Sequence, residues 1–310
     1  MFETSLTNKR IAKNTLLLYF RMIFMMLVSL YTSRVILEAL GVEDFGVYNV
    51  VGGVVSMFGF LNSAMSSSTQ RYITFELGRG VMSEQQKVFT TSVQIHMFIA
   101  LIVVLLGETV GLWFLENKMV IDQSRHSAAF WVFQCSVLTM AVSIISVPYN
   151  AIIIAHEKMS AFAYISVVEV VLKLCIVFLL LVTPFDKLIF YAVLLLVVQL
   201  MVRVIYGSYC NRHFKETKLR CIWDKSMFKE MMGFAGWNLI GNCASILSTQ
   251  GVNILLNIFF GPTVNAARGV AVQVQNAVLQ FSQNFQTALN PQITKNYAKG
   301  DREAMYKLII

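Results

Sequence analysis

Long apolar runs recur along the whole chain. A helical run of about 20 apolar residues crosses the ~30 Å hydrocarbon core of a bilayer. The recurrence of such runs therefore predicts an all-α integral membrane protein with about eight transmembrane helices. The predicted spans cover roughly residues 14–37, 46–68, 88–112, 127–153, 160–182, 188–208, 231–258 and 265–289.

The chain also contains an internal repeat. A shift of about 220 residues places "ALGVEDFGVYNVV" on "FFGPTVNAARGVA", with Gly41 on Gly261, and further along it places Gly80 on Gly300. An even number of predicted spans separates the two copies, so both copies begin on the same side of the membrane. This arrangement predicts two parallel-repeat lobes related by an axis along the membrane normal.

The second copy ends at Ile310, where its third helix should begin. We therefore expect a multi-span helical bundle whose second lobe is truncated. The predicted divisions are an N-terminal six-helix lobe (1–210), a basic cytoplasmic linker (211–230) and the start of a C-terminal lobe (231–310), which holds helices 7 and 8 and a cytoplasmic amphipathic segment.

Charge is scarce and unevenly distributed. Only 14% of the residues are charged, against about 25% in an ordinary soluble domain. The net charge of +8 could indicate nucleic-acid binding, but most basic residues lie in alternate loops, and the opposite loops keep only Lys118, Arg125 and Lys187. The positive-inside rule accounts for this pattern and predicts a cytoplasmic N-terminus. We expect no nucleic-acid partner, and we expect the basic segment around residues 212–229 to contact anionic lipid.

The predicted eighth span has a polar face. At 100° per residue, its amides fall within an arc of about 100°. Such a face can form hydrogen bonds between helices or line a water-filled cavity, and the number of amides favours the cavity. The polar residues are Asn265, Gln273, Asn276, Gln280, Gln283, Thr287 and Asn290 on span 8, with Asn238, Asn242, Ser245 and Thr249 on one face of span 7.

Basic residues also occur within the spans themselves, at Arg21, Arg34, Lys173, Arg203 and Arg268. A charge near the bilayer midplane costs about 2.5–3.5 kcal/mol on insertion scales, so each needs a partner or water. Arg203 and Arg34 lie near helix ends and can reach an interface. Arg21 is deeper and has no acid in its own span. Since Arg21 and Arg34 differ by roughly 20 Å in height, we expect them to act at two depths of a translocation path.

Two further features lie in spans 4 and 5. Glu169 and Lys173 stand four residues apart in the order that favours an intrahelical ion pair. The pair is either purely structural or a charged site on a cavity wall, where it takes part in coupling. Pro148 removes one hydrogen bond from span 4 and is a candidate hinge. His156, in the short turn after span 4, is expected to be a solvated residue.

The stretches "LGVEDFGVYNVV" and "VPYNAIIIAHEKMSAFAYISVVEVVLKL", with the turn from Gly261 to Arg268, make the chain resemble polysaccharide-type lipid flippases. These bacterial inner-membrane proteins export lipid-linked O-antigen (lipopolysaccharide) and capsule repeat units. They belong to the multidrug/oligosaccharidyl-lipid/polysaccharide exporter superfamily. The resemblance implies two lobes in a V shape and alternating access around a cationic cavity.

The resemblance also implies roles for particular residues. Basic residues of the first and eighth helices would bind the diphosphate of the substrate, and Arg21, Arg34 and Arg268 match those positions. Lys173 is a further candidate, and Asn238, Asn242, Gln273 and Gln280 are candidates for binding the saccharide. The implied partners are membrane lipid, a lipid-linked oligosaccharide, and either a coupling ion (Na⁺ or H⁺) or the membrane potential.

Two alternatives remain. A cation-coupled multidrug exporter of the same superfamily relies on a carboxylate on an early helix, whereas the first span here holds two arginines and no acid. A membrane-embedded glycosyltransferase or polysaccharide polymerase would need a large hydrophilic loop or clustered acids, and the chain shows neither. No glycine-rich phosphate loop occurs either. We therefore expect a transporter without enzymatic activity and without a cofactor.

Overall fold

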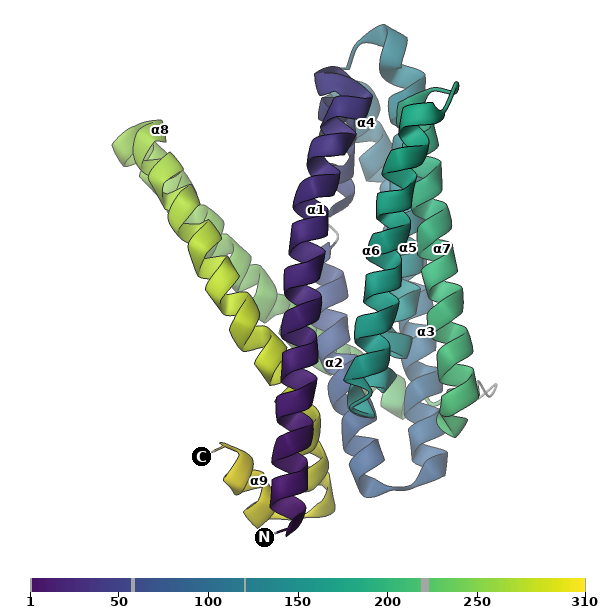
Figure 1. The fold of residues 1–310 in the computed structure, drawn as a ribbon, viewed down its shortest axis with the longest axis vertical. Coiled ribbons are helices and arrows are strands. Elements are labelled where there is room, and N and C mark those ends of the chain that lie inside the picture. Colours follow the sequence, from purple (N-terminus) through teal and green to yellow (C-terminus); the bar gives the residue numbers. More distant parts are fainter. Residues whose placement is uncertain (1, 57–58, 120, 219–222, 310) are drawn as a thin grey trace.

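The computed structural model describes residues 2–56, 59–119, 121–218 and 223–309, and at some positions of α1, α2 and α8 only the backbone is described. Within these ranges every regular element is a helix (Figure 1). The longer helices are α1 (Phe2–Ser56), α2 (Gly59–Arg79), α3 (Met82–Leu106), α5 (His126–Ala155), α6 (Met159–Val182), α7 (Lys187–His213) and α8 (Lys225–Lys299). The shorter ones are a π-helical turn (Gly107–Gly111), α4 (Leu112–Asn117), 3₁₀ turns (Gln123–Arg125 and Lys215–Thr217) and α9 (Arg302–Ile309).

Five of the described helical segments are long and apolar enough to cross a membrane. The first segment, Lys9–Val55, contains the predicted span 14–37 and the beginning of the predicted span 46–68. The chain leaves helical geometry between these two spans at Gly41, where φ is 79°. α8 contains both of the last two predicted spans and doubles back on itself in its middle (Figure 1).

Gly80 and Gly300, the glycines that the repeat aligns, share an unusual conformation. Their φ angles are 77° and 80°, in the left-handed region that glycine adopts at little cost. Gly300 is the C-cap of α8, and Gly80 follows directly after α2. The aligned glycines thus end corresponding helices in the same way, as the repeat predicts.

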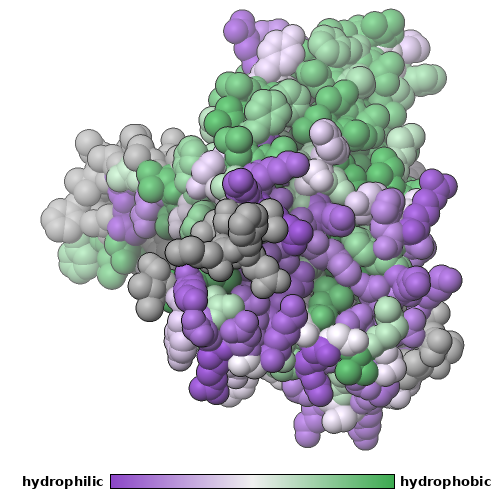
Figure 2. All heavy atoms as spheres, turned by 60° about the horizontal axis from the view of Figure 1, so that its bottom comes forward, coloured by the Kyte–Doolittle hydropathy of each residue, from purple (hydrophilic) through white to green (hydrophobic). Residues whose placement is uncertain are grey.

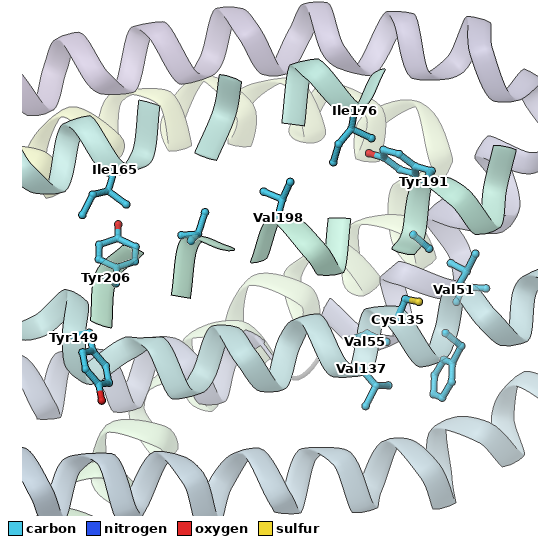
Figure 3. Packing of buried hydrophobic residues seen from close by; sticks show 14 of the residues in the cluster. Val51, Val55, Cys135, Val137, Tyr149, Ile165, Ile176, Tyr191, Val198 and Tyr206 are labelled. Atoms are coloured by element: carbon cyan, nitrogen blue, oxygen red, sulfur yellow. The ribbon is translucent and has the colours of Figure 1, made fainter. Parts of the chain in front are cut away.

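Helices α1 to α7 pack into one bundle around a shared apolar core. Figure 3 shows this core between the helices, with Tyr206 and Ile165 at one end and Tyr191 and Val51 at the other. Edge-to-face aromatic contacts add to it, with ring centres 5.0 Å apart for Tyr48 and Tyr191. Pro148 is buried inside α5, which continues through it without a break.

The two ends of the bundle differ in polarity. The N-terminus, the α2–α3 turn and the α8–α9 turn lie together at the bottom of Figure 1. Figure 2 turns this end forward and shows hydrophilic residues gathered over it, with apolar residues beyond. We call it the basic end, because most of the lysines and arginines outside the spans lie there.

The end opposite the basic end is held by one arginine. Arg125 donates to Asp44 in the turn after Gly41 and, at 2.7 Å, to Asp186 in the loop between α6 and α7. Lys187 also donates to the carbonyl oxygen of Ala39 at 3.2 Å. Two of the three basic residues on this side of the chain therefore join loops of the first bundle.

α8 meets the bundle at the basic end and diverges from it toward the other end, giving the V shape of Figure 1. Near the vertex, Phe281 packs against Tyr19 with ring centres 5.4 Å apart, and Asn284 donates to the sulfur of Met22. Closer to the basic end, a Cβ on Gly78 would lie 2.7 Å from the Cβ of Ala298. Glycine at position 78 therefore permits this close approach of α2 and α8.

Candidate functional site: intramembrane charges and the polar face of α8

Glu169 and Lys173 form the ion pair that their spacing predicts. The Lys173 ammonium donates to Glu169 Oε1 at 2.6 Å in the middle of α6. The pair borders a cavity of about 350 Å³ between α1, α5, α6 and α7. Hydroxyl and amide groups complete its polar wall, from Tyr48, Ser136, Thr139, Ser143 and Gln199. The cavity lies within the first bundle, away from the opening of the V.

Arg21 also faces this bundle. Its guanidinium carbon lies 4.3 Å from the centre of the Phe162 ring of α6. The Glu169 carboxylate and Tyr206 are close enough to interact with it electrostatically. Its Nε is buried and has no hydrogen-bond partner in the described part of the chain. The acid that Arg21 lacks in its own span is thus supplied by α6.

These contacts make Glu169 the shared anion of two cations, Arg21 and Lys173. An isolated charge would be costly at this depth, and the Glu169 carboxylate lowers that cost for both cations. One positive charge remains in excess. Sequence alone finds the i, i+4 pair but not the third member, because the approach of α1 to α6 is a tertiary contact.

Arg34 lies in a different environment, near the end opposite the basic end. Its Nε donates to Glu38 Oε1 at 3.2 Å, and both side chains are largely exposed. Glu38 lies just beyond the predicted first span, so the helix does contain an acid next to this arginine. Arg21 and Arg34 are therefore not brought together, in agreement with their separation in the sequence.

The remaining candidates lie on α8. Arg268 is half-buried, Gln280 is exposed, and Asn238 and Asn242 are half-buried. The side chain of Gln273 lies outside the described side chains. Asn276, Gln283 and Asn290 are exposed like Gln280, so four amides of the predicted polar face are accessible. In the part of the chain that the structure describes, no group of His, Cys, Asp and Glu could hold a metal ion.

Two further side chains, His156 and Arg203, have partners near the basic end. His156, expected to be a solvated turn residue, instead forms a hydrogen bond with the buried Glu216 and stacks on Phe214, with ring centres 4.2 Å apart. That expectation was wrong because the linker folds back onto the turn. Arg203 lies over the ring of Tyr149 at 3.8 Å.

A comparison with protein families decides the broad identity. A model described as polysaccharide biosynthesis protein matches residues 11–297. The chain belongs to this family. No curated protein matches the chain.

Solved structures show the same fold in the superfamily predicted from the sequence. The bent form of the Vibrio cholerae MATE transporter VcmN is similar with a TM-score of 0.82 and 14% identity, over 100% of this chain and 70% of that one. The outward-facing conformation of a multidrug resistance MATE family transporter of the MOP superfamily gives 0.78 and 12%, over 97% and 67%. A MOP superfamily transporter from Pyrococcus furiosus gives 0.76 and 13%, over the same shares. The chain spans about two thirds of their length.

The family match makes this chain a member of the polysaccharide biosynthesis protein family, and its fold is that of the solved MOP superfamily transporters. The predicted resemblance and the all-α membrane fold are confirmed.

Proposed function

We propose that this protein flips a lipid-linked oligosaccharide, a polyprenyl-diphosphate repeat unit, across a bacterial inner membrane. The excess of cations among its intramembrane charges carries the proposal. α1, α6 and α8 hold Arg21, Arg34, Lys173 and Arg268. Glu169 and Glu38 offset only part of that charge. A diphosphate is the most strongly charged part of such a substrate, and its transfer through hydrocarbon is the main electrostatic barrier to flipping.

Arginine suits this task. Its planar guanidinium binds phosphate oxygens through two parallel hydrogen bonds and stays charged when partly desolvated. In our proposal Arg21, Arg268 and Arg34 hold the diphosphate at successive depths of the path. The amides of α8, with Asn238 and Asn242, hydrate the saccharide.

The V shape supports alternating access. The two parts of the chain meet at the basic end and diverge at the other (Figure 1). If the basic end is cytoplasmic, as the positive-inside rule predicts, the structure corresponds to an outward-open state. Rocking of the lobes, with Pro148 as a flexible point of α5, would then expose the site to the cytoplasm.

Lys173 and Glu169 have a different place in this scheme. Their cavity lies among helices of the first bundle and has a volume of only about 350 Å³, so a large saccharide would not fit there without rearrangement. The pair, with Arg21, could couple substrate binding to the conformational change. When substrate binds, Arg21 would leave Glu169 and bind the substrate phosphate instead. Either Na⁺, H⁺ or the membrane potential would drive the cycle.

The alternative is a cation-coupled multidrug exporter of the same superfamily. Several solved structures with the fold of this chain are named as MATE transporters, but their sequence identity to this chain is only 11–14%. The two arginines of the first span favour an anionic substrate, whereas a cationic drug would be repelled by them. We therefore prefer the lipid-linked oligosaccharide.

The test changes Arg21 and Arg268 separately to alanine and to lysine in the full-length protein. Cells are then assayed for surface polysaccharide and for accumulated lipid-linked precursor. Alanine should abolish export at normal expression, and lysine should restore part of it, because it keeps the charge but loses the two-pronged geometry. Arg302→Ala, an exposed position outside the spans, serves as the control and should export normally. Normal export by both alanine variants would contradict the proposal.

A further inference from the structure

Two consecutive residues, His156 and Glu157, form the turn between α5 and α6. His156 contacts the linker that precedes α8, and Glu157 contacts the last turns of α8. Glu157 is the second of them, and its side chain is only 6% exposed. It adopts a left-handed φ of 59°, the only non-glycine residue to do so among those the structure describes. Such a conformation is disfavoured for residues with a side chain, so the contacts around it must hold it in place.

The Glu157 carboxylate receives donors from the far end of α8. Lys295 Nζ lies 2.7 Å from Oε1, and the Gln292 amide donates to Oε2. Both donors come from the same face of the helix, one turn apart. Hydrogen bonds to ionised groups are about twice as strong as neutral ones, particularly when partly buried.

The beginning of α1 joins the same group. Arg10 lies 3.5 Å from Oε2 of Glu157, and Asn14 donates to the Glu157 carbonyl oxygen at 3.5 Å. The Glu157 carboxylate thus joins the beginning of α1 to the last turns of α8. The preceding residue, His156, holds the linker that leads into α8 through its bond with Glu216.

These contacts occur where the V is closed. The close approach of Gly78 to Ala298 and the tilted packing of Phe75 on Tyr297 lie on the neighbouring helix pair. A transporter that opens its basic end must move α8 away from α1 and from this turn, and it must then expose the Glu157 carboxylate and the Lys295 ammonium to water separately.

We propose that Glu157 is the latch of the basic end: its bonds to Lys295 and Gln292 set how often this end opens. The proposal rests on the alternating access of the proposed function, but it does not depend on which cargo is carried. It assigns to a turn residue outside the charged cavity a role in the balance between the two open states.

The experiment measures closure directly in the full-length protein in lipid vesicles. Spin labels are attached at Val81→Cys and Lys299→Cys, exposed positions on the two sides of the closed end, with the native cysteines replaced by alanine. Double electron–electron resonance (DEER) spectroscopy then gives the distribution of distances between the two spin labels. A basic end that opens adds a population at longer distance.

Glu157→Gln keeps the size of the side chain and removes its charge, and Lys295→Met removes the partner. We expect each to raise the ratio of the long-distance to the short-distance population by roughly tenfold, the change that the loss of about 1.4 kcal/mol produces. The double variant should go no further than the stronger single one, because both remove the same bond. Lys295→Met also tests the latch if Glu157→Gln fails to fold.

Glu303→Gln is the matched control. Glu303 accepts from Lys307 at 2.6 Å on α9, but its side chain is 82% exposed and the pair lies within one helix. It should leave the distances unchanged. Unchanged distances in both Glu157→Gln and Lys295→Met would overturn the latch, even if the Arg21 and Arg268 variants show the expected loss of export. If the distances shift in the Glu157 and Lys295 variants while the Arg21 and Arg268 variants export normally, the latch is supported and the proposed lipid-linked cargo is contradicted.

Discussion

Arg21 of α1 lies over the ring of Phe162 in α6, with its guanidinium carbon 4.3 Å from the ring centre. The deepest arginine of the first helix therefore packs against the first bundle in this conformation. Its partner ring and the Glu169 carboxylate together make its position tolerable within the membrane. Release of Arg21 toward a substrate phosphate would exchange these two interactions for stronger ones.

Phe162 is thus expected to stabilise Arg21. Phe162→Leu removes the aromatic face and should lower the free energy of unfolding by about 1–2 kcal/mol, the range of a desolvated cation–π contact together with lost packing. Phe162→Tyr keeps the face and should lose much less. Denaturation of the purified variants in mixed micelles measures both. Equal stability of the leucine and tyrosine variants would show that the ring acts only as apolar volume.

Glu169 serves two cations, so the two halves of its ion pair should not be equivalent. Glu169→Gln leaves Lys173 and Arg21 without an anion and should destabilise the protein by about 2–3 kcal/mol. Lys173→Met leaves Glu169 next to Arg21 and should cost less. The free energies of unfolding of the two variants test this order, and a larger loss from Lys173→Met would contradict it.

The double variant, Glu169→Gln with Lys173→Met, separates a structural pair from a functional one. If the pair is only structural, folding and export should recover together, because no unpaired charge of the pair remains. We expect recovery of folding without full recovery of export. Export is measured as surface polysaccharide, at expression matched to the unmodified protein. A folded and fully active double variant would remove the coupling role.

Arg125 should be important for stability but not for transport. Arg125→Met removes the arginine partner of Asp44 and leaves Asp186 with the backbone N–H groups of Leu188 and Ile189, and it should lower the free energy of unfolding by about 2 kcal/mol. Lys118→Met at the same end is the control, since among the described residues the Lys118 side chain makes only a distant contact, 5.8 Å, with the Trp113 ring. Thermal denaturation compares the two. A similar melting temperature for both variants would show that the Arg125 bonds add little.

Glu216 predicts a pH dependence of stability. Burial raises its pKa, but the hydrogen bond from His156 and the bonds from backbone groups outweigh burial and hold the pKa below the usual 4.5. A carboxyl with a lowered pKa stabilises the fold above the unfolded-state pKa, and this contribution is lost as the pH falls through the folded-state pKa. Stability should therefore decline below about pH 4.5.

Glu216→Gln provides the comparison for this pH dependence. It should be less stable than the unmodified protein at pH 6, and the difference should shrink as the pH falls below 4.5. Melting temperatures between pH 3 and 6 test this. A difference that stays constant over that range would show that the Glu216 carboxylate does not contribute through its charge.

Much of the helical architecture could be predicted from the amino-acid sequence. Within the described residues the predicted spans fall on helical segments, because a run of apolar residues long enough to cross a bilayer must satisfy its backbone groups internally, and a helix does so locally. The repeat predicted that Gly80 and Gly300 would correspond, and both end helices with left-handed φ. The pair Glu169–Lys173 also followed from spacing alone, since residues four apart are neighbours on any helix.

Tertiary structure alone decided where those local features point. Arg21 could have faced the opening of the V, lipid or the first bundle; the packing of α1 on α6 placed it next to Phe162 and Glu169. His156 was expected to be a solvated turn residue, and only the return of the linker and of α8 to that turn gave it and the neighbouring Glu157 their partners. Periodicity sets which side chains share a face of one helix, whereas contacts between residues more than a hundred positions apart depend on how the helices pack together.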